Sequence, residues 1–220
     1  MRIFVFAILL LFAPAAATAQ TVPDLGPEAD MPSVEDFDAL PDPEPEAGGQ
    51  VVVEDEDPTE TLSKLDSLYA DLSGADDPAV RERVSRDIRR IWMDSGSDTV
   101  NLLMVRAGHA IQAKDHGLAL DLLDVVVVLR PSFAEGWNRR ATVHYMKEDF
   151  GKSLVDIERT LALEPRHWGA LSGLAIIQRR LGFENESLET FRRALEIHPG
   201  LENAENAIEA LEKAAEGEPV

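Results

Sequence analysis

The chain has 220 residues, a formal net charge of −20 and no cysteine. The lack of cysteine excludes disulfides, thiolate metal sites and cysteine nucleophiles. The acidic balance argues against duplex nucleic acid and anionic lipid as partners, because binding to both depends on basic residues that neutralise phosphate.

Residues 1–19 have the features of an export signal. Arg2 supplies the positive end, residues 3–12 are an uninterrupted apolar run, and an A-x-A cleavage pattern ends at Ala19, before Gln20. Such a run is too short to span a bilayer, which needs about 20 apolar residues. We therefore expect an exported protein, periplasmic or secreted, that begins at Gln20. An uncleaved membrane anchor is the alternative.

Residues 20–57 are expected to form an acidic, proline-rich, disordered linker. They hold six of the thirteen prolines and thirteen Asp or Glu residues, without any Lys, Arg or His. Such a segment cannot bury enough apolar surface to offset its ordering entropy. The linker is either an acidic docking segment or a solvated spacer.

Residues 58–99 predict an N-terminal helical hairpin, a degenerate repeat or cap. Asp57-Pro58 and Asp77-Pro78 each offer a helix N-cap followed by a first-turn proline. The second predicted helix carries a row of arginines, which suggests either a face that binds nucleic acid or anionic lipid, or a solvated face with interleaved acids. These arginines are Arg81, Arg83, Arg86, Arg89 and Arg90.

Three blocks of 34 residues follow, at 100–133, 134–167 and 168–201. A fixed period of this length is typical of stacked helical hairpins. The landmarks that recur at this spacing include Pro131, Pro165 and Pro199, and Ala107, Ala141 and Ala175. Register also assigns the four valines Val125–Val128 to a helix, although in isolation they would suggest a buried strand.

The block 134–167 shows how one unit is built. Two apolar stripes of helical period flank a turn, and the small residues Ala141 and Ser153 lie on opposite helices, where they permit close approach. Ser132 and Glu135 predict a capping box at the start of the first helix. One hairpin cannot bury its own apolar face, so neighbouring blocks must stack on it.

These blocks resemble the tetratricopeptide repeat (TPR) family. That family favours large apolar residues at positions 4 and 24 of the repeat, small residues at 8 and 20, and proline at 32. The matching residues are Leu103, Ala107, Ala119, Leu123 and Pro131; Trp137, Ala141, Ser153, Ile157 and Pro165; and Leu171, Ala175, Ser187, Phe191 and Pro199. Position 7, often Leu in the family, departs from the pattern as Arg106 and Arg140.

The resemblance implies an all-α, right-handed α-solenoid of TPR hairpins. The hairpin at 58–99 would precede it, residues 202–215 would form a C-terminal capping helix, and residues 216–220 would be a frayed tail.

No pattern of catalytic, cofactor-binding or metal-binding residues emerges, and we expect no enzyme activity, no cofactor and no metal. The sequence lacks a P-loop, G-x-G-x-x-G, H-E-x-x-H and G-x-S-x-G. His109 and His116 could be imagined as a metal pair, but ordinary packing or surface histidines explain them better.

The resemblance also implies a partner-binding groove along the first helix of each repeat. The predicted groove residues are Asn101, Met104, Asn138, Arg139, Thr142, Tyr145, Ser172, Ile176, Arg179 and Arg180. Arg139 matches an arginine of carboxylate-clamp TPR domains, whereas Glu135 and Val105 do not match the neighbouring clamp positions. The arginines either hold an acidic, extended segment or only neutralise neighbouring acids.

The sequence therefore predicts an exported, non-catalytic adaptor that binds a protein or peptide in this groove, without nucleic acid and without an integral membrane span. The alternative is an envelope scaffold that binds cell-wall glycan or an assembly complex through its convex face.

Overall fold

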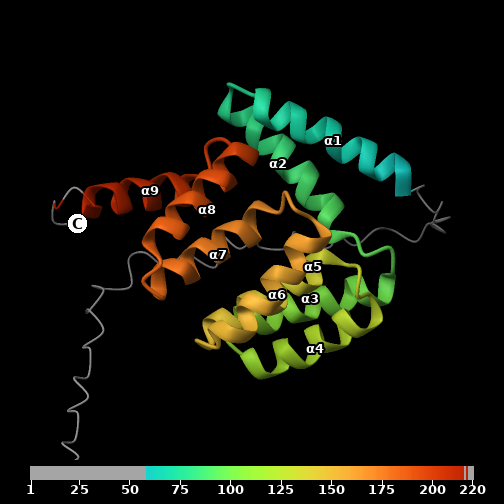
Figure 1. Cartoon of the computed structure of the whole chain (residues 1–220). Helices are drawn as coiled ribbons and strands as arrows, with labels where there is room; N and C mark the ends of the chain where they lie inside the picture. Colours follow the sequence, from blue (N-terminus) through green and yellow to red (C-terminus); the bar gives the residue numbers. More distant parts are fainter. Residues whose placement is uncertain (1–57, 216, 218–220) are drawn as a thin grey trace, which may run out of the picture. The chain divides into compact units, whose positions relative to one another are not determined.

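The computed structural model describes residues 58–215 and residue 217 (Figure 1). The predicted signal, the acidic linker and the cap residue Asp57 lie outside this part of the chain. All regular elements in the described part are α-helices: α1 (Pro58–Gly74), α2 (Pro78–Met93), α3 (Asp98–Gln112), α4 (His116–Leu129), α5 (Ala134–Met146), α6 (Phe150–Leu163), α7 (Trp168–Arg180), α8 (Glu184–Ile197) and α9 (Glu202–Ala215). Among these described helices, none has the length and apolar character needed to cross a membrane.

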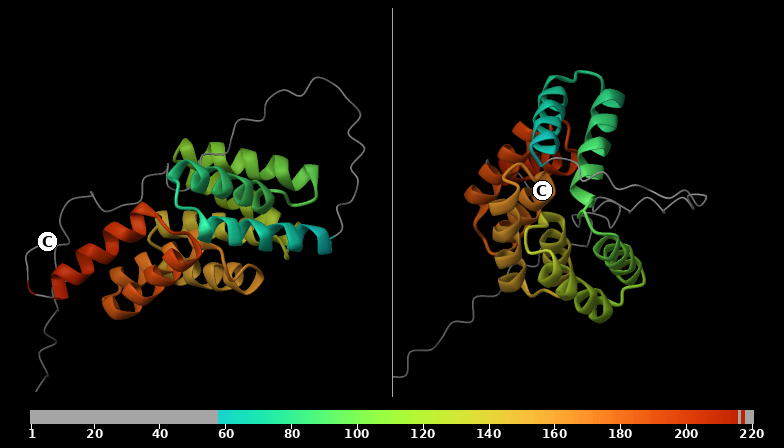
Figure 2. Two further views of the ribbon diagram at one scale, coloured as in Figure 1. Left: turned by 90° about the horizontal axis from the view of Figure 1, so that it is seen from above. Right: turned by 90° about the vertical axis from the view of Figure 1, so that its right-hand side faces the viewer.

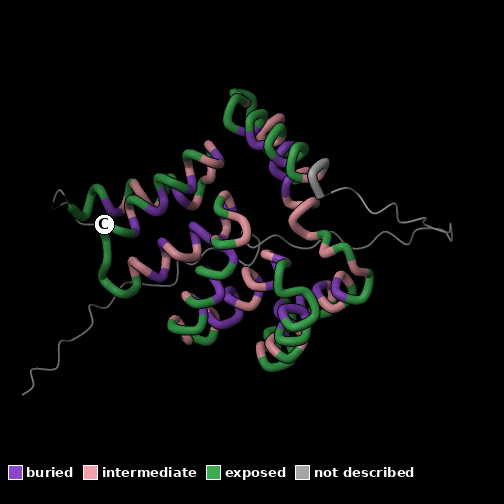
Figure 3. The backbone as a smooth tube through the Cα atoms, turned by 45° about the vertical axis from the view of Figure 1, so that its right-hand side comes forward, coloured by how far each residue is buried: buried purple, intermediate pink, exposed green. Residues whose placement is uncertain are grey.

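The helices α3 to α8 form three hairpins in series, one for each 34-residue block. The two helices of each hairpin pack together, and α4 packs on α5, α6 on α7 and α8 on α9 (Figures 1 and 2). Buried residues lie on the helix faces that turn toward each other (Figure 3). The predicted all-α helical-repeat solenoid is confirmed.

The turns inside the three hairpins share one backbone conformation. Lys114, Glu148 and Gly182 occupy equivalent places and have φ angles of 58°, 58° and 83°. This left-handed conformation stops the first helix, and two of the three residues adopt it despite carrying a side chain. Asp115 and Asp149 then cap the second helix by accepting the backbone N–H of Leu118 and Lys152.

The predicted capping box of α5 is wrong. Phe133 is the N-cap residue of α5, and no side chain caps it. Ser132 is exposed. Glu135 is buried and turns instead toward residues of α5 and α7.

The predicted close approach of paired helices is confirmed, and it includes a hydrogen bond. Ser153 Oγ donates to the carbonyl oxygen of Ala141 at 2.8 Å, and Ser187 Oγ donates to that of Ala175 at 2.8 Å. Both alanines are at most 2 % exposed. The small residues thus allow the helices to meet, and the serine hydroxyl satisfies its own hydrogen-bonding need across the interface.

The N-terminal hairpin α1–α2 shares its core with the third repeat. Apolar residues of this hairpin, such as Leu72 and Ile88, are buried in one cluster with Trp168, and Ile197 and Leu201 pack against that cluster. Two further contacts fix the position: Ser85 Oγ lies 2.7 Å from His198 Nε2, and the guanidinium of Arg166 lies 3.9 Å from the ring centre of Tyr69. The hairpin therefore does not continue the stack ahead of α3. It reaches across to the start of α7 and the end of α8.

Candidate functional site

A cavity of about 340 Å³ lies where the N-terminal hairpin meets the first helices of the repeats. Its lining comes from five places in the chain: Glu82, Arg89, Trp92 and Met93 of α2; Ile111 of α3; Glu135, Asn138, Arg139, Thr142 and Met146 of α5; His167, Trp168, Gly169, Ser172 and Ile176 at and within α7; and His198 with residues 200–203 after α8. We call this space the central cavity.

Glu135 is the electrostatic centre of one wall. Its carboxylate accepts hydrogen bonds from Arg139 Nε at 2.7 Å, Asn138 Nδ2 at 3.0 Å and His167 Nε2 at 3.0 Å. His167 Nδ1 accepts the backbone N–H of Ala170 at 3.1 Å, so the proton of the neutral imidazole lies on Nε2 and points to Glu135. Burial, the largest influence, raises the pKa of Glu135, but the charge of Arg139 and the contact with His167 outweigh burial and lower the pKa to about 2.

One aromatic ring of the hairpin, that of Trp92, closes one side of the cavity together with rings at the start of α7. Trp92 stacks on His167 with ring centres 4.1 Å apart and lies 4.3 Å from the ring centre of Trp168. The neighbouring Met93 Sδ accepts a hydrogen bond from Arg139 Nη2 at 3.6 Å. The ion pair on α5 therefore also holds the end of α2.

Four buried polar atoms of lining residues have no hydrogen-bond partner within the described part of the chain: Trp92 Nε1, Ser172 Oγ, His198 Nδ1 and Asn203 Oδ1. Ser172 and His198 are the most deeply buried of these residues, at 5 % and 7 % exposed. Ser85 Oγ donates to the carbonyl oxygen of Arg81, so His198 Nε2 must donate to Ser85 and His198 Nδ1 is an acceptor. Burial lowers the pKa of His198, which favours this neutral form.

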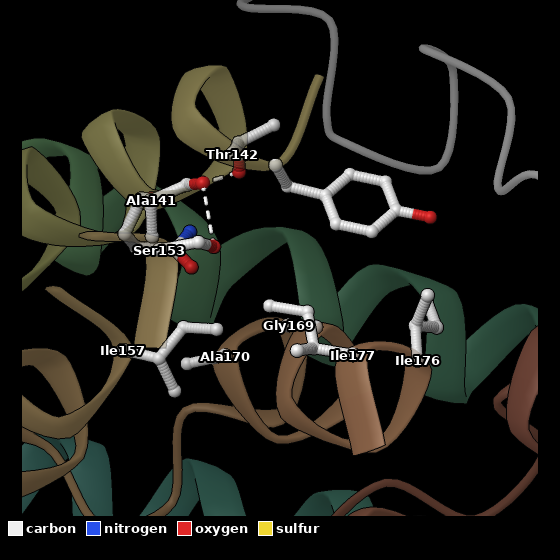
Figure 4. Close-up of a pocket in the computed structure, with 11 residues that line it drawn as sticks. Ala141, Thr142, Ser153, Ile157, Gly169, Ala170, Ile176 and Ile177 are labelled. Atoms are coloured by element: carbon white, nitrogen blue, oxygen red, sulfur yellow. Dashed lines mark hydrogen bonds between the residues drawn. The ribbon is translucent and has the colours of Figure 1, made fainter. Parts of the chain in front are cut away.

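A narrow pocket continues from the central cavity between α5, α6 and α7. It has room for about 10 Å³, on the order of one water molecule, and shares Asn138, Thr142, Gly169 and Ile176 with the cavity. Figure 4 shows the hydrogen bond from Ser153 to Ala141 on one side, with Ile157, Ala170 and Ile177 facing it. Its lining is mostly apolar, so it has room for about one methyl group and not for a charged group.

Half of the predicted groove residues line the central cavity. These are Asn138, Arg139, Thr142, Ser172 and Ile176. Tyr145 lines the narrow pocket. Arg179 and Arg180 lie in the last turn of α7 and line neither space, so the cavity does not gather the three predicted arginines.

Asn101 and Met104 were assigned to the groove by register, and neither lines the central cavity or the narrow pocket. Met104 is 1 % exposed and belongs to the core around α3 and α4, because a long apolar side chain is more stable away from water. The side chain of Asn101 binds the α2–α3 connection, accepting from the backbone N–H and hydroxyl of Ser95 and donating to Asp94.

Sequence reasoning missed the contribution of α2 and of the turn after α8. Both lie outside the 34-residue register, and their residues come together only because the hairpin folds across to the third repeat. The pair Glu135 and Arg139 is different, since its spacing of four residues on one helix was a readable signal.

The unusual arginine at position 7 of the second repeat has a buried partner. Arg140 donates to both carboxylate oxygens of Asp156, at 2.8 and 2.7 Å, and to Asp124 at 2.8 Å. Its guanidinium also lies 4.8 Å from the ring centre of Trp137. Asp156 is 2 % exposed, so the pair replaces an apolar contact between α5 and α6.

Within the described residues, no three His, Cys, Asp or Glu side chains are grouped so that they could hold a metal ion.

Comparison with known proteins places the fold. A TPR repeat-containing protein of Rhizobium etli is 39 % identical over 178 residues, which are 80 % of this chain and 87 % of that protein. No family model matches the chain. The solved first TPR of Spaghetti (RPAP3), bound to the HSP90 peptide SRMEEVD, superposes with a TM-score of 0.52 at 19 % identity, covering 56 % of this chain and 96 % of that one. The crystal structure of MamA gives a TM-score of 0.50 at 17 % identity, covering 65 % and 86 %.

Proposed function

The chain belongs to the tetratricopeptide repeat family, and we propose that it is an exported, non-catalytic adaptor that holds an extended segment of a partner protein in the central cavity. As a TPR-type helical repeat protein it is a protein-interaction scaffold. The segment-binding role, the cavity as its site and export are the parts that need testing.

The observation that carries the proposal is the combination of volume and unpaired polar atoms in the cavity. A volume of about 340 Å³ lies at the lower end of the range of ligand pockets, ~300–1,000 Å³. Buried polar atoms are nearly always hydrogen-bonded in folded proteins, so Ser172 Oγ and His198 Nδ1 are candidates for contacts with a bound main chain. The hydroxyl of Ser172 can donate to a carbonyl oxygen, and His198 Nδ1 can accept from an amide.

The lining favours a segment that carries one small apolar side chain. The main-chain N–H and C=O groups of this segment would have to be free to form hydrogen bonds with the cavity wall. Ile176 and Gly169 border both the cavity and the narrow pocket, which offers an apolar slot beside the polar wall. The charges in the wall are largely compensated within the protein, since Arg139 pairs with Glu135 and Arg89 pairs with Glu82 at 3.0 Å.

An acidic segment remains a second possibility for the same site. It would have to compete with Glu135 for Arg139, and its affinity would fall as salt screens the charges. A segment bound through its main chain and an apolar side chain would show little dependence on salt. The RPAP3 domain was solved with an HSP90 peptide that contains acidic residues, but its likeness to this chain concerns the fold alone.

The absence of cysteine in the sequence gives a direct test of the site. A photo-crosslinker is attached to Ile176→Cys, in the cavity, and in a second protein to Val155→Cys on α6, which is 63 % exposed. Irradiation in the native compartment, followed by mass spectrometry, identifies what each position touches. We expect one defined partner segment at position 176 and none at 155. Equal crosslinking at both positions, or crosslinking only at 155, would contradict the assignment to the cavity.

Export has its own test. N-terminal sequencing of the native protein should find Gln20 as the first residue. Intact Met1 in a membrane fraction would show that the N-terminal segment is an anchor.

A further inference from the structure

The hairpin α1–α2 forms one wall of the central cavity, and its apolar core is mostly its own. The third repeat adds only Trp168 to the buried residues of that core, with Ile197 and Leu201 packed against it. We call the contact of α1–α2 with residues 166–168 and 198–201 the hairpin dock.

The hairpin dock leaves buried polar atoms without partners. Trp92 Nε1 and His198 Nδ1 have no hydrogen-bond partner within the described part of the chain, although both rings pack against Trp168. Inside the repeats, by contrast, Ser153 and Ser187 each donate a hydrogen bond across the helix pair. Burying a polar atom without a partner costs free energy. The hairpin dock is therefore less well satisfied than the contacts within the repeats.

The connection between the hairpin and the first repeat provides a fixed pivot. Residues 94–97 join α2 to α3, and Gly96 has a left-handed φ of 67°. The backbone N–H of Ser95 donates to Asn101 Oδ1 at 3.0 Å, and Arg130 Nη2 donates to the carbonyl oxygen of Gly96 at 3.1 Å. The hairpin can therefore leave the third repeat while its attachment to the first repeat stays in place.

His198 is the titratable group at the hairpin dock. Its Nε2 donates to Ser85 Oγ of α2 at 2.7 Å, which leaves Nδ1 without a proton. A second proton would place an N–H on Nδ1, which has no acceptor, and a positive charge on a residue that is 7 % exposed. Burial lowers the pKa of His198 below its ordinary value of 6.5. The docked hairpin thus favours neutral His198, and proton uptake favours the open hairpin.

The charges around His198 do not offer a partner for a second proton. Glu82 of α2 is already paired with Arg89 at 3.0 Å. The charges of Arg89 and Arg81 lower the pKa of His198, whereas the charge of Glu82 raises it. The charged and titratable groups of this region are Arg81, Glu82 and Arg89 on α2, the paired Glu135 and Arg139 on α5, His167 before α7 and Glu202 after α8.

We propose that the hairpin α1–α2 is an acid-released gate of the central cavity, closed while His198 is neutral and opened when His198 becomes an imidazolium. This regulation rests on the proposed function, because the gate controls the site assigned to the partner segment. Opening removes the cavity wall formed by α2. The second proton also removes the acceptor that His198 Nδ1 offers to a bound main chain. The partner segment is therefore held near neutral pH and released in acid.

The absence of cysteine allows the gate to be measured in the full-length protein without any ligand. Ser85→Cys places a thiol in the hairpin dock, and Ser187→Cys places one between α7 and α8 as the matched control. Both serines are 0 % exposed. The rate of modification by dithiodipyridine is divided by the rate for the exposed Val155→Cys at the same pH. This normalised rate reports how often each buried site opens.

The normalised rate of Ser85→Cys should rise several-fold between pH 7.5 and pH 5.5. The limit is about tenfold for one histidine with a pKa of 6.5 in the open state. Adding His198→Gln should abolish the rise, because glutamine can donate to position 85 but takes up no proton. Ser187→Cys should react more slowly and without this rise. Ile197→Cys, which lies on α8 against the hairpin core, repeats the measurement with Ser85 intact and should show the same direction.

Three results would overturn the gate. Equal normalised rates for Ser85→Cys and Ser187→Cys would show that the hairpin opens only when the whole fold does. A rise that persists with His198→Gln would assign it to another group. An unchanged rate at pH 5.5 in both Ser85→Cys and Ile197→Cys would show that acid does not open the hairpin. None of these measurements involves a partner, so crosslinking at position 176 decides the partner site separately.

Discussion

Replacing Glu135 with glutamine should destabilise the protein strongly, because it removes a buried charge in the wall of the central cavity. The substitution keeps the shape of the side chain and removes the charge that Arg139 and His167 both contact. The side chains of Glu135 and Arg139 are 7 % and 10 % exposed, so water cannot replace the lost partner.

Two independent arguments give the expected decrease in the free energy of unfolding. Removing one partner of a buried ion pair typically costs ~3–5 kcal/mol. The pKa of Glu135, lowered from 4.5 to about 2, corresponds to about 3 kcal/mol at neutral pH, at about 1.4 kcal/mol per pKa unit. We therefore expect the free energy of unfolding to fall by about 3 kcal/mol, and Tm by roughly 6–12 °C for a domain of this size.

The assay is urea unfolding at pH 7, followed by circular dichroism and by the fluorescence of the tryptophans. Glu158→Gln, an exposed glutamate of α6, is the matched control and should change stability by less than about 0.5 kcal/mol. The reasoning is refuted if Glu135→Gln costs less than about 1 kcal/mol, because the carboxylate would then not anchor Arg139 and His167.

The same contact fixes the direction of the acid dependence. The pKa of Glu135 is lower in the folded state than in the unfolded state, so its contribution is fully present above pH 4.5 and is lost as pH falls toward 2. The free energy of unfolding of the Glu135→Gln variant should therefore fall less than that of the wild type between pH 4.5 and pH 2.

Three further predictions concern the repeats and the hairpin. Arg140→Leu alone should lower the free energy of unfolding by about 3 kcal/mol or more, because it leaves the buried Asp156 without its partner. Arg140→Leu combined with Asp156→Leu should recover most of this stability in a thermal melt, and equal losses in both proteins would contradict the pairing. Glu148→Gly should raise the free energy of unfolding by about 1 kcal/mol, since φ is 58° there and glycine adopts that conformation without strain; a loss in urea unfolding would contradict this. Burial lowers the pKa of His198, so the unfolded state binds its proton more readily below pH 6.5 and stability should fall from pH 7 to 5; His198→Gln should reduce that slope, and an unchanged slope would exclude His198 as its source.

The 34-residue period made most of the repeat architecture predictable. A residue's place in the block determines which helix it joins and which face it presents, so the contact of Ala175 with Ser187 could be predicted without coordinates. Register also placed the four valines of α4 in a helix, against their preference for strands.

Register could not predict what happens outside the repeat. The docking of α2 depends on Trp92 meeting His167 and Trp168, a contact between segments about 75 residues apart with no periodic signal. Register also misassigned Met104, because position alone says that the residue faces the groove while its apolar side chain is drawn into the core.

The most direct measurement of the central claim is a calorimetric titration of the partner segment identified by crosslinking. The synthetic segment is titrated into the wild-type protein, into Ile176→Arg, which fills the cavity, and into Val155→Arg, which changes only the outer face of α6. We expect a single site in the wild type, an affinity weakened about tenfold or more by Ile176→Arg, and no change with Val155→Arg. An affinity unaffected by Ile176→Arg in a protein that still folds, or lost with Val155→Arg, would contradict the assignment of partner binding to the central cavity.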